Sequence, residues 1–213
     1  MVASGASSRE RYRTQVREEI KQHAWEQIAT AGVSALSLNA IAKQVGMSGP
    51  ALYRYFASRD ELITELIRDA YRSLADAMRA AFGSGADVTE LAYTVREWAL
   101  ADPQRYFLIY GTPVPGYHAP DDTTQISAEI MSVLVEAFAG LPQDNPTTPF
   151  DAHLDEHRRW AEGRSAPATV LHRAVSFWTR LHGVLSLELA GHFTGMEFDP
   201  ALLYADELNT LLT

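Results

Sequence analysis

Apolar residues recur along most of the chain at intervals of three and four positions, which is the period of an α-helix. The first such stretch begins at Arg9 and ends at Gly32, with Val16, Ile20 and Ile28 near one face. Serine, glycine and proline residues then mark where later helices begin and end. The pattern predicts further helices over residues 38–45, from 49 onward, and over 59–82, 88–101, 103–110, 123–139, 150–161, 167–192 and 199–212.

No stretch shows the sustained alternation that is typical of a strand. Two proline-rich stretches, 113–122 and 140–149, predict loops. The predicted fold class is therefore all-α, with about nine or ten helices.

Two of the short predicted helices are joined by Gly46-Met47-Ser48, the arrangement of a helix-turn-helix. Ser37 and Ser48 are suited to cap the two N-termini, and Pro50 fits the first turn of the second helix. Because the turn is tight, the helices must cross at a steep angle. We expect the pair to form a small core with the first helix of the chain, made of Leu38, Ile41, Ala42, Val45, Leu52 and Phe56.

The residues outside this core are candidates for contact with another molecule. A helix in the major groove of DNA reads bases with its N-terminal residues and holds phosphates with its flanks. Tyr53 and Tyr55 lie about 200° apart on a helix, so we give Tyr55 the partly structural role. The predicted DNA-contacting residues are Ser37, Lys43, Ser48, Gly49, Pro50, Ala51, Tyr53, Arg54, Tyr55 and Arg59, with Arg9, Arg11 and Arg13 trailing into an adjacent groove.

The distribution of charge supports a nucleic-acid role for the N-terminal part, although the chain as a whole carries −9. Residues 1–60 hold eight Lys/Arg and five Asp/Glu, a net of +3, whereas the remaining 153 hold ten and twenty-two, a net of −12. This asymmetry predicts a basic module and an acidic body. We assign residues 1–8 to a disordered arm, 9–58 to the DNA-binding domain and 59–213 to a regulatory and dimerisation domain.

Other features of composition limit the class of protein. The chain has no cysteine, so it has no disulfide and no thiolate site. No apolar run is long enough for a signal peptide or a membrane-spanning helix, so we expect a soluble cytoplasmic protein with no membrane partner.

The stretch SLNAIAKQVGMSGPALYRYFASRDELI, residues 37–63, resembles the DNA-binding module of the TetR family of bacterial repressors. The resemblance rests on Ile41-Ala42, Gly46, Ser48 and the runs at 52–56 and 58–62, and it covers roughly residues 10–60. It implies binding to double-stranded operator DNA, followed by an all-helical domain that binds a small molecule and dimerises through its last two long helices. Gly49-Pro50 departs from the family, which often has a lysine or arginine there, so the operator sequence is left open.

The C-terminal part carries a second, shorter resemblance. Trp178, His182 and Gly183 are similar to the Trp-His-Gly signature of the WHG subgroup of TetR-like regulators. The helix over 167–192 is apolar on almost every side, so it must be covered on more than one face. We expect one face to pack within the domain, and another to join helix 199–212 in a homodimer with operator half-sites about 34–36 Å apart or a multiple. The alternative is a buried monomer core.

Aromatic residues of the acidic body predict a pocket for an effector, and those that could line it include Tyr71, Trp98, Tyr106, Phe107, Tyr110, Trp160 and Phe177. From the body we select Trp98, Phe107, Tyr110, Phe177, Trp178 and His182 as the candidate lining residues. No cluster of Arg or Lys accompanies them, so a mostly apolar ligand is expected, and no cofactor is implied. The alternative for His182 is a hydrogen-bonded histidine of the core.

Two alternatives compete with a ligand-released repressor. HLDEH at 153–157 fits the H-x-x-E-H pattern of some zinc peptidases, with His153 and His157 as ligands and Glu156 as base. The stretch is crowded with charged residues and has no clear third ligand nearby, so we expect no metal and no enzyme activity. The second alternative is a DNA-binding activator with the same fold, because the position of the operator relative to the promoter decides between repression and activation.

Overall fold

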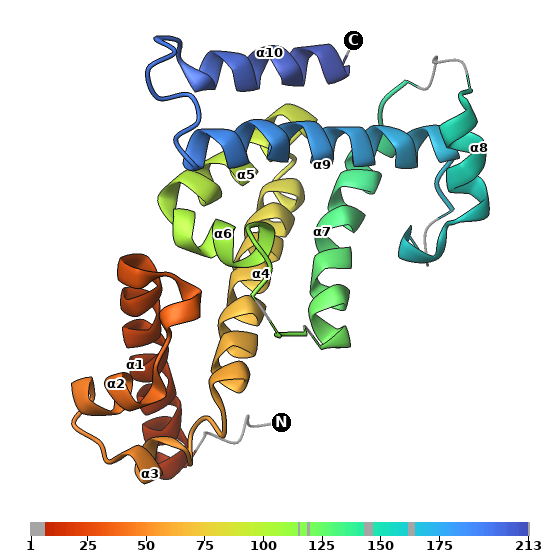
Figure 1. Cartoon of the computed structure of the whole chain (residues 1–213). Helices are drawn as coiled ribbons and strands as arrows, with labels where there is room; N and C mark the ends of the chain where they lie inside the picture. Colours follow the sequence, from red (N-terminus) through yellow and green to blue (C-terminus); the bar gives the residue numbers. More distant parts are fainter. Residues whose placement is uncertain (1–6, 115, 119, 143–146, 162–164, 213) are drawn as a thin grey trace. The chain divides into compact units, whose positions relative to one another are not determined.

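The computed structural model describes residues 7–114, 116–118, 120–142, 147–161 and 165–212 (Figure 1). Within these residues the chain forms ten α-helices and two short 3-10 helices, and no strand. The predicted all-α fold is therefore confirmed.

The chain divides into two compact units, which we describe separately. The first is Met1–Asp69 with Thr112–Ala119, and the second is Ala70–Gly111 with Pro120–Thr213. Helix α4 (Arg59–Gly83) contributes residues to both. The first unit also holds α1 (Ser8–Ala31), η1 (Val33–Ala35), α2 (Leu38–Gln44) and α3 (Gly49–Leu52). The second also holds α5 (Val88–Ala101), α6 (Pro103–Tyr110), α7 (Asp121–Ala139), α8 (Pro149–Glu156), η2 (Arg159–Ala161), α9 (Ala168–Leu189) and α10 (Pro200–Leu212).

Helix α1 begins at a capping box. The side chain of Ser7 accepts a hydrogen bond from the backbone of Glu10 at 3.2 Å, and the Glu10 carboxylate accepts one from the backbone of Ser7 at 2.6 Å. Arg9, Arg11 and Arg13 lie in the first turns of α1, as the helical pattern from Arg9 predicted, so a contact of these arginines with an adjacent groove would be made from a helix. Most of the predicted arm, residues 1–6, lies outside the described residues.

The small core of the first unit is close to the predicted one. The side chains of Leu38, Ile41, Ala42, Leu52 and Phe56 are buried, Leu36 joins them, and Val45 is only half-buried. Arg17 of α1 holds the following elements together: its guanidinium donates to the carbonyl of Tyr55, pairs with Glu65 at 3.1 Å and lies 4.1 Å from the centre of the Phe56 ring. These contacts fix α3 against α1 and α4.

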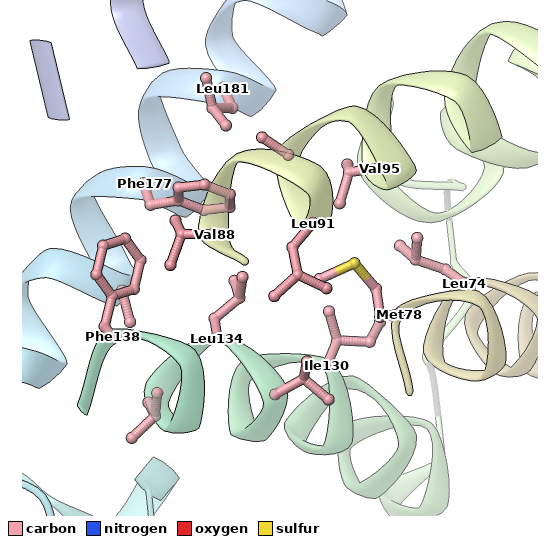
Figure 2. Close-up of a cluster of buried hydrophobic side chains, with 14 of the residues drawn as sticks. Leu74, Met78, Val88, Leu91, Val95, Ile130, Leu134, Phe138, Phe177 and Leu181 are labelled. Carbon is pink, nitrogen blue, oxygen red and sulfur yellow. The ribbon is translucent and has the colours of Figure 1, made fainter. Parts of the chain in front are cut away.

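The second unit is built around α9, which lies between α10 on one side and α5 and α7 on the other (Figure 1). Its core brings apolar side chains of α4, α5, α7 and α9 together (Figure 2). The labelled members are Leu74, Met78, Val88, Leu91, Val95, Ile130, Leu134, Phe138, Phe177 and Leu181. The sequence predicted that α9 is covered on more than one face, and within this unit α5, α7 and α10 cover part of its surface.

Two helices end three or more residues before the position that the sequence predicts. The predicted helix over 150–161 ends at Glu156, and η2 follows it. Asp151, which is 2 % exposed, accepts from the backbone and hydroxyl of Thr148 and pairs with His172 of α9 at 2.9 Å. The predicted helix over 167–192 ends at Leu189, because Gly191 adopts a φ of 76° and the backbone of His192 bonds back to Leu187. No helix in the described part of the chain is long and apolar enough to cross a membrane.

Candidate nucleic-acid interface and ligand site

Helix α3 exposes a small polar surface above the core of the first unit. Leu52 and Phe56 are fully buried, whereas Tyr53 is 46 % exposed and Arg54 is exposed beside it. Backbone bonds from Tyr53 to Gly49 and from Arg54 to Ala51 continue the helical path for about one more turn. The two side chains therefore point outward from a backbone that the buried residues hold in place.

The other predicted contact residues of this region differ in their surroundings. Lys43, Ser48 and Pro50 are exposed, and Ala51 and Tyr55 are half-buried. Gly49 is also half-buried, and a β-carbon at this position would lie 3.3 Å from the side-chain oxygen of Asn39. Glycine thus allows α3 to pass close to α2, which is a structural reason for this residue in addition to its predicted contact with DNA.

Ser37 and Arg59 take part in contacts inside the unit. The Ser37 side chain caps α2, and its backbone N–H donates to Gln27 at 3.0 Å. The guanidinium of Arg59 donates to the carbonyls of Val33 and Leu36 at 2.8 and 3.2 Å and so holds the segment between α1 and α2. The cap by Ser37 agrees with the sequence prediction, whereas the structural role of Arg59 was not predicted.

A basic cleft with a volume of about 390 Å³ lies between the start of α1 and α3. Its lining holds three arginines and no carboxylate, so it attracts anions such as phosphate. Tyr12, absent from the predicted contacts, belongs to it, and the spacing of Arg9, Tyr12 and Arg13 on one helical face could have indicated this. The lining residues are Arg9, Tyr12, Arg13, Met47, Ala51, Arg54 and Tyr55.

The second unit contains an aromatic cluster around His182 of α9. The ring of His182 lies 4.0 Å from that of Trp178 and 4.4 Å from that of Tyr110 on α6, between ring centres. Tyr106, one turn before Tyr110, stacks on His182 at 5.5 Å, and Tyr71 of α4 meets Tyr110 edge-on at 5.9 Å. We call these five residues the His182 cluster. All five share the second unit.

The six predicted lining residues separate into three groups. Tyr110, Trp178 and His182 are brought together in the His182 cluster, and Phe107 adjoins it through Tyr106 at 5.7 Å. Trp98 is not in ring contact with the cluster, and its indole donates to Ser73 at 3.1 Å. Phe177 is fully buried in the hydrophobic core against Phe138, which assigns it to packing. Tyr106 and Tyr71 belong to the wider set of aromatic residues considered for the pocket but were not among the six selected, although the i, i+4 pair of tyrosines on α6 was a visible signal.

Hydrogen bonding and burial determine the chemistry of this cluster. The Tyr106 hydroxyl lies 3.0 Å from Nδ1 of His182 and donates to the His182 carbonyl at 3.2 Å. Burial lowers the pKa of His182 from 6.5 to about 4 and raises the pKa of Tyr106 to about 12. Burial also raises the pKa of Tyr110. At neutral pH the cluster is therefore uncharged.

The lowered pKa of His182 predicts a loss of stability in acid. Between its folded and unfolded pKa values, the unfolded chain binds a proton that the folded chain does not, so stability falls as the pH drops below 6.5. Between about pH 7 and about pH 4.5, we expect wild type to lose about 2 kcal/mol more than His182→Gln in free energy of unfolding. Urea unfolding at both pH values measures this, and equal losses would mean that folded His182 is protonated in acid.

The HLDEH stretch does not form the geometry of a zinc site. Helix α8 ends at Glu156, so His157 lies beyond the helix, and its Nδ1 is hydrogen-bonded to the carbonyl of His153 at 2.9 Å. The two imidazole rings stack with centres 4.1 Å apart. Within the described part of the chain, no group of three or more His, Cys, Asp or Glu residues is placed to hold a metal ion. The zinc hydrolase alternative has no support.

An outward face of α9 and α10 is the remaining surface of interest. On α9 and its C-cap residue Ala190, the exposed positions Arg180, Gly183, Leu187 and Ala190 follow one helical stripe, and Leu187 is 44 % exposed. On α10, Leu202 is 70 % exposed. A β-carbon added at Gly183 would meet no atom within 4 Å. We call these five residues the α9–α10 stripe.

A helix-turn-helix with an exposed second helix beside a basic cleft, in an all-helical chain, defines a DNA-binding transcriptional regulator. Two family models match the sequence: "Bacterial regulatory proteins, tetR family" over residues 20–66 and "Tetracyclin repressor-like, C-terminal domain" over residues 88–211. The chain belongs to the TetR family of transcriptional regulators and is not an enzyme. The C-terminal match includes Trp178, His182 and Gly183, which carried the second resemblance.

Relatives match over nearly the whole chain. The HTH-type transcriptional regulator Rv1816 of Mycobacterium tuberculosis is 34 % identical, and the match covers 94 % of this chain and 92 % of the relative. The crystal structure of the regulatory protein SCO4313 is similar with a TM-score of 0.92 and 70 % identity, over 97 % of this chain and 99 % of that one. The fatty acid degradation regulator FadR from Bacillus halodurans, with a TM-score of 0.61 and 14 % identity over 92 % and 97 %, shares the fold.

Proposed function

We propose that this regulator is a homodimeric repressor that acts in the cytoplasm and leaves a palindromic operator when a small, mostly apolar effector binds. The observation that carries the proposal is the outward exposure of Tyr53 and Arg54 above a buried core that fixes α3. Such a helix is held in one orientation, as direct readout of bases requires. The functional domains are those of the sequence analysis, 9–58 for DNA and 59–213 for regulation and dimerisation.

The basic cleft supplies the second part of the interface. Arg9 and Arg13 of α1 share it with Arg54, so one phosphate of the DNA backbone can bind between α1 and α3. Exposed Lys43 adds a flanking charge, and Ser48, Gly49, Pro50, Ala51 and Tyr55 complete the proposed contact surface. Ser37 and Arg59 support this surface chiefly by holding the segment before α2 and the start of α4.

Dimerisation is supported by the α9–α10 stripe. Its members are small or apolar apart from Arg180, and exposed leucines on two adjacent helices favour burial against a second copy. Two-fold pairing of α9 and α10 would produce a four-helix interface and relate the two recognition helices by the same axis. The operator is then an inverted repeat with half-sites about 34–36 Å apart or a multiple of that distance.

The His182 cluster is the proposed effector site, with Phe107 beside it. The effector would favour a conformation of the second unit in which the two recognition helices have a different separation. Helix α4 carries this change, because it is one continuous helix with residues in both units. By linkage, operator DNA lowers the affinity for the effector by the same factor by which the effector lowers the affinity for DNA.

Selection of bound fragments from random duplex DNA, at moderate salt, tests the proposal. We expect enrichment of one inverted repeat, because a symmetric dimer with two fixed recognition helices reads the same bases in each half. A reporter with this operator across its promoter should be repressed by the protein. Enrichment of no sequence, with only salt-sensitive non-specific binding, would contradict the operator part of the proposal.

A further inference from the structure

Two buried polar atoms of the His182 cluster have no hydrogen-bond partner. They are the hydroxyl oxygen of Tyr110 and the Nε2 atom of His182. The two rings lie 4.4 Å apart between centres, so both atoms are within reach of one small molecule. An unsatisfied buried polar group destabilises a fold, so such a pair calls for an explanation.

The hydrogen bonds of Tyr106 assign a role to each atom. The Tyr106 hydroxyl has one proton, and the carbonyl of His182 at 3.2 Å can only accept it. The bond between Tyr106 and Nδ1 at 3.0 Å is then made by an N–H of His182 that donates to the Tyr106 oxygen. A neutral imidazole with its proton on Nδ1 leaves Nε2 as a bare acceptor. The Tyr110 hydroxyl, in contrast, has a proton to donate.

The surroundings of the two atoms are uncharged. The neighbouring groups are the rings of Tyr71, Tyr106 and Trp178. Burial is the cause of the lowered pKa of His182, so no nearby charge stabilises its protonated form. Arg96 on α5 is held by Glu188 at 2.6 Å. An ionised carboxylate placed against Tyr110 and His182 would therefore lose its hydration without gaining a counter-charge.

We propose that Tyr110 and His182 form the polar anchor of the effector site, and that the effector is a neutral molecule with a hydrogen-bond donor and an acceptor on neighbouring atoms. The donor binds Nε2 of His182, and the acceptor binds the Tyr110 hydroxyl. Trp178 and Tyr71 flank the anchor and favour a flat apolar body on the same molecule. A primary amide on an aromatic ring has this chemistry. The inference rests on the proposed effector site and specifies what that site binds.

Thermal unfolding without any ligand gives the first test. Tyr110→Phe removes a hydroxyl that has no partner, so the midpoint should stay within about 1 °C of wild type or rise by about 2–4 °C. Tyr106→Phe removes a hydroxyl that is bonded to His182, so its midpoint should fall by about 2–4 °C. A fall in Tyr110→Phe as large as that in Tyr106→Phe would overturn the proposal, since Tyr110 would then have a partner in the empty protein.

Binding of matched probes gives the second test. Calorimetry with 2-naphthamide and with the 2-naphthoate anion compares a neutral donor–acceptor group with a charged acceptor on the same ring. We expect the amide to bind at least about tenfold more tightly, and Tyr110→Phe to weaken it about fivefold to tenfold. Tyr93→Phe, which alters a tyrosine on the exposed side of α5, is the control and should bind the amide as wild type does.

The outcomes separate the anchor from the regulation. Equal affinity for the two probes, no effect of Tyr110→Phe, or no binding of either probe at about 1 mM would overturn the anchor. Release of operator DNA by 2-naphthamide is measured in parallel. If 2-naphthamide binds, Tyr110→Phe weakens this binding and no DNA is released, the result would support the anchor and count against effector-controlled release. If 2-naphthamide releases DNA equally well from wild type, Tyr110→Phe and Tyr93→Phe, the result would support effector-controlled release and reject the anchor.

Discussion

Gly183→Leu should turn the protein into a monomer and lower its affinity for a palindromic operator by about 10²–10⁴-fold. A leucine at the centre of the α9–α10 stripe would prevent two copies of α9 from approaching closely, whereas the single chain has room for it, because a β-carbon at Gly183 meets no atom within 4 Å. Loss of the dimer removes the gain in affinity that comes from binding two half-sites at once. Sedimentation measures the oligomeric state, and fluorescence anisotropy measures binding to the operator.

The chain offers a matched control for this substitution. Gly83, at the end of α4, is also an exposed helical glycine with open space around its β-carbon position. Gly83→Leu should leave both the dimer and DNA binding unchanged. In either variant, leucine favours the helix by about 1 kcal/mol over glycine, so misfolding is not the expected cause of a defect. A dimeric Gly183→Leu protein with normal operator affinity would show that the two copies meet elsewhere.

Helix positions could be predicted from the sequence because their end signals are local. Helix α4 was predicted over 59–82 and spans Arg59–Gly83, and α5 and α6 have their predicted bounds. The side chains of Asp87 and Asp102 cap these two helices, because each accepts a hydrogen bond from the backbone N–H three residues further along the chain. The end of α8 at Glu156 was missed. His157 leaves the helix with φ −121° and ψ 51°, and Arg158, the next residue, donates to the carbonyl of Ala166, a contact that no helical period contains.

The same distinction between local and distant contacts explains the outcome at the candidate sites. The alternation of Leu52 and Phe56 with Tyr53 and Arg54 follows from the helical period, so the buried and exposed faces of α3 were predictable. The structural use of Arg59 was not, since it binds carbonyls of Val33 and Leu36 at separations of 26 and 23 residues. The residue type of Arg59 alone suggested a contact with a phosphate. Its guanidinium is less available for that contact, because it already donates to two backbone carbonyls.

The His182 cluster shows this limit most clearly. The spacing of Trp178 and His182 placed both on one face of α9, and Tyr106 and Tyr110 share a face of α6. Nothing in either spacing indicates that the two faces meet, because Tyr106 and His182 are 76 residues apart. Nor does composition separate Phe177, which packs in the core, from Trp178, which faces the cluster. Packing across the unit decides which aromatic side chains are available to a ligand.

Replacement of both Tyr53 and Arg54 by alanine should lower the affinity for the selected operator by about 100-fold or more while the dimer stays intact. Each half-site would lose one arginine contact and one tyrosine contact, and a single base or phosphate contact contributes about 1–3 kcal/mol. Both side chains are exposed, so the free energy of unfolding should change by less than about 0.5 kcal/mol. Anisotropy titrations over a range of salt concentrations measure the effect.

The salt dependence distinguishes the kind of contact that Arg54 makes. If Arg54 binds a phosphate beside Arg9 and Arg13, the variant should release about two fewer counterions per dimer, one for each half-site. If it binds a base, the salt slope should stay constant and selectivity between half-sites should fall. Tyr93→Ala with Arg79→Ala, in the second unit, removes the same residue types and charge and is the control. Wild-type affinity in the Tyr53 and Arg54 variant would mean that α3 is not the recognition helix, and the search for the DNA contact would move to the start of α1.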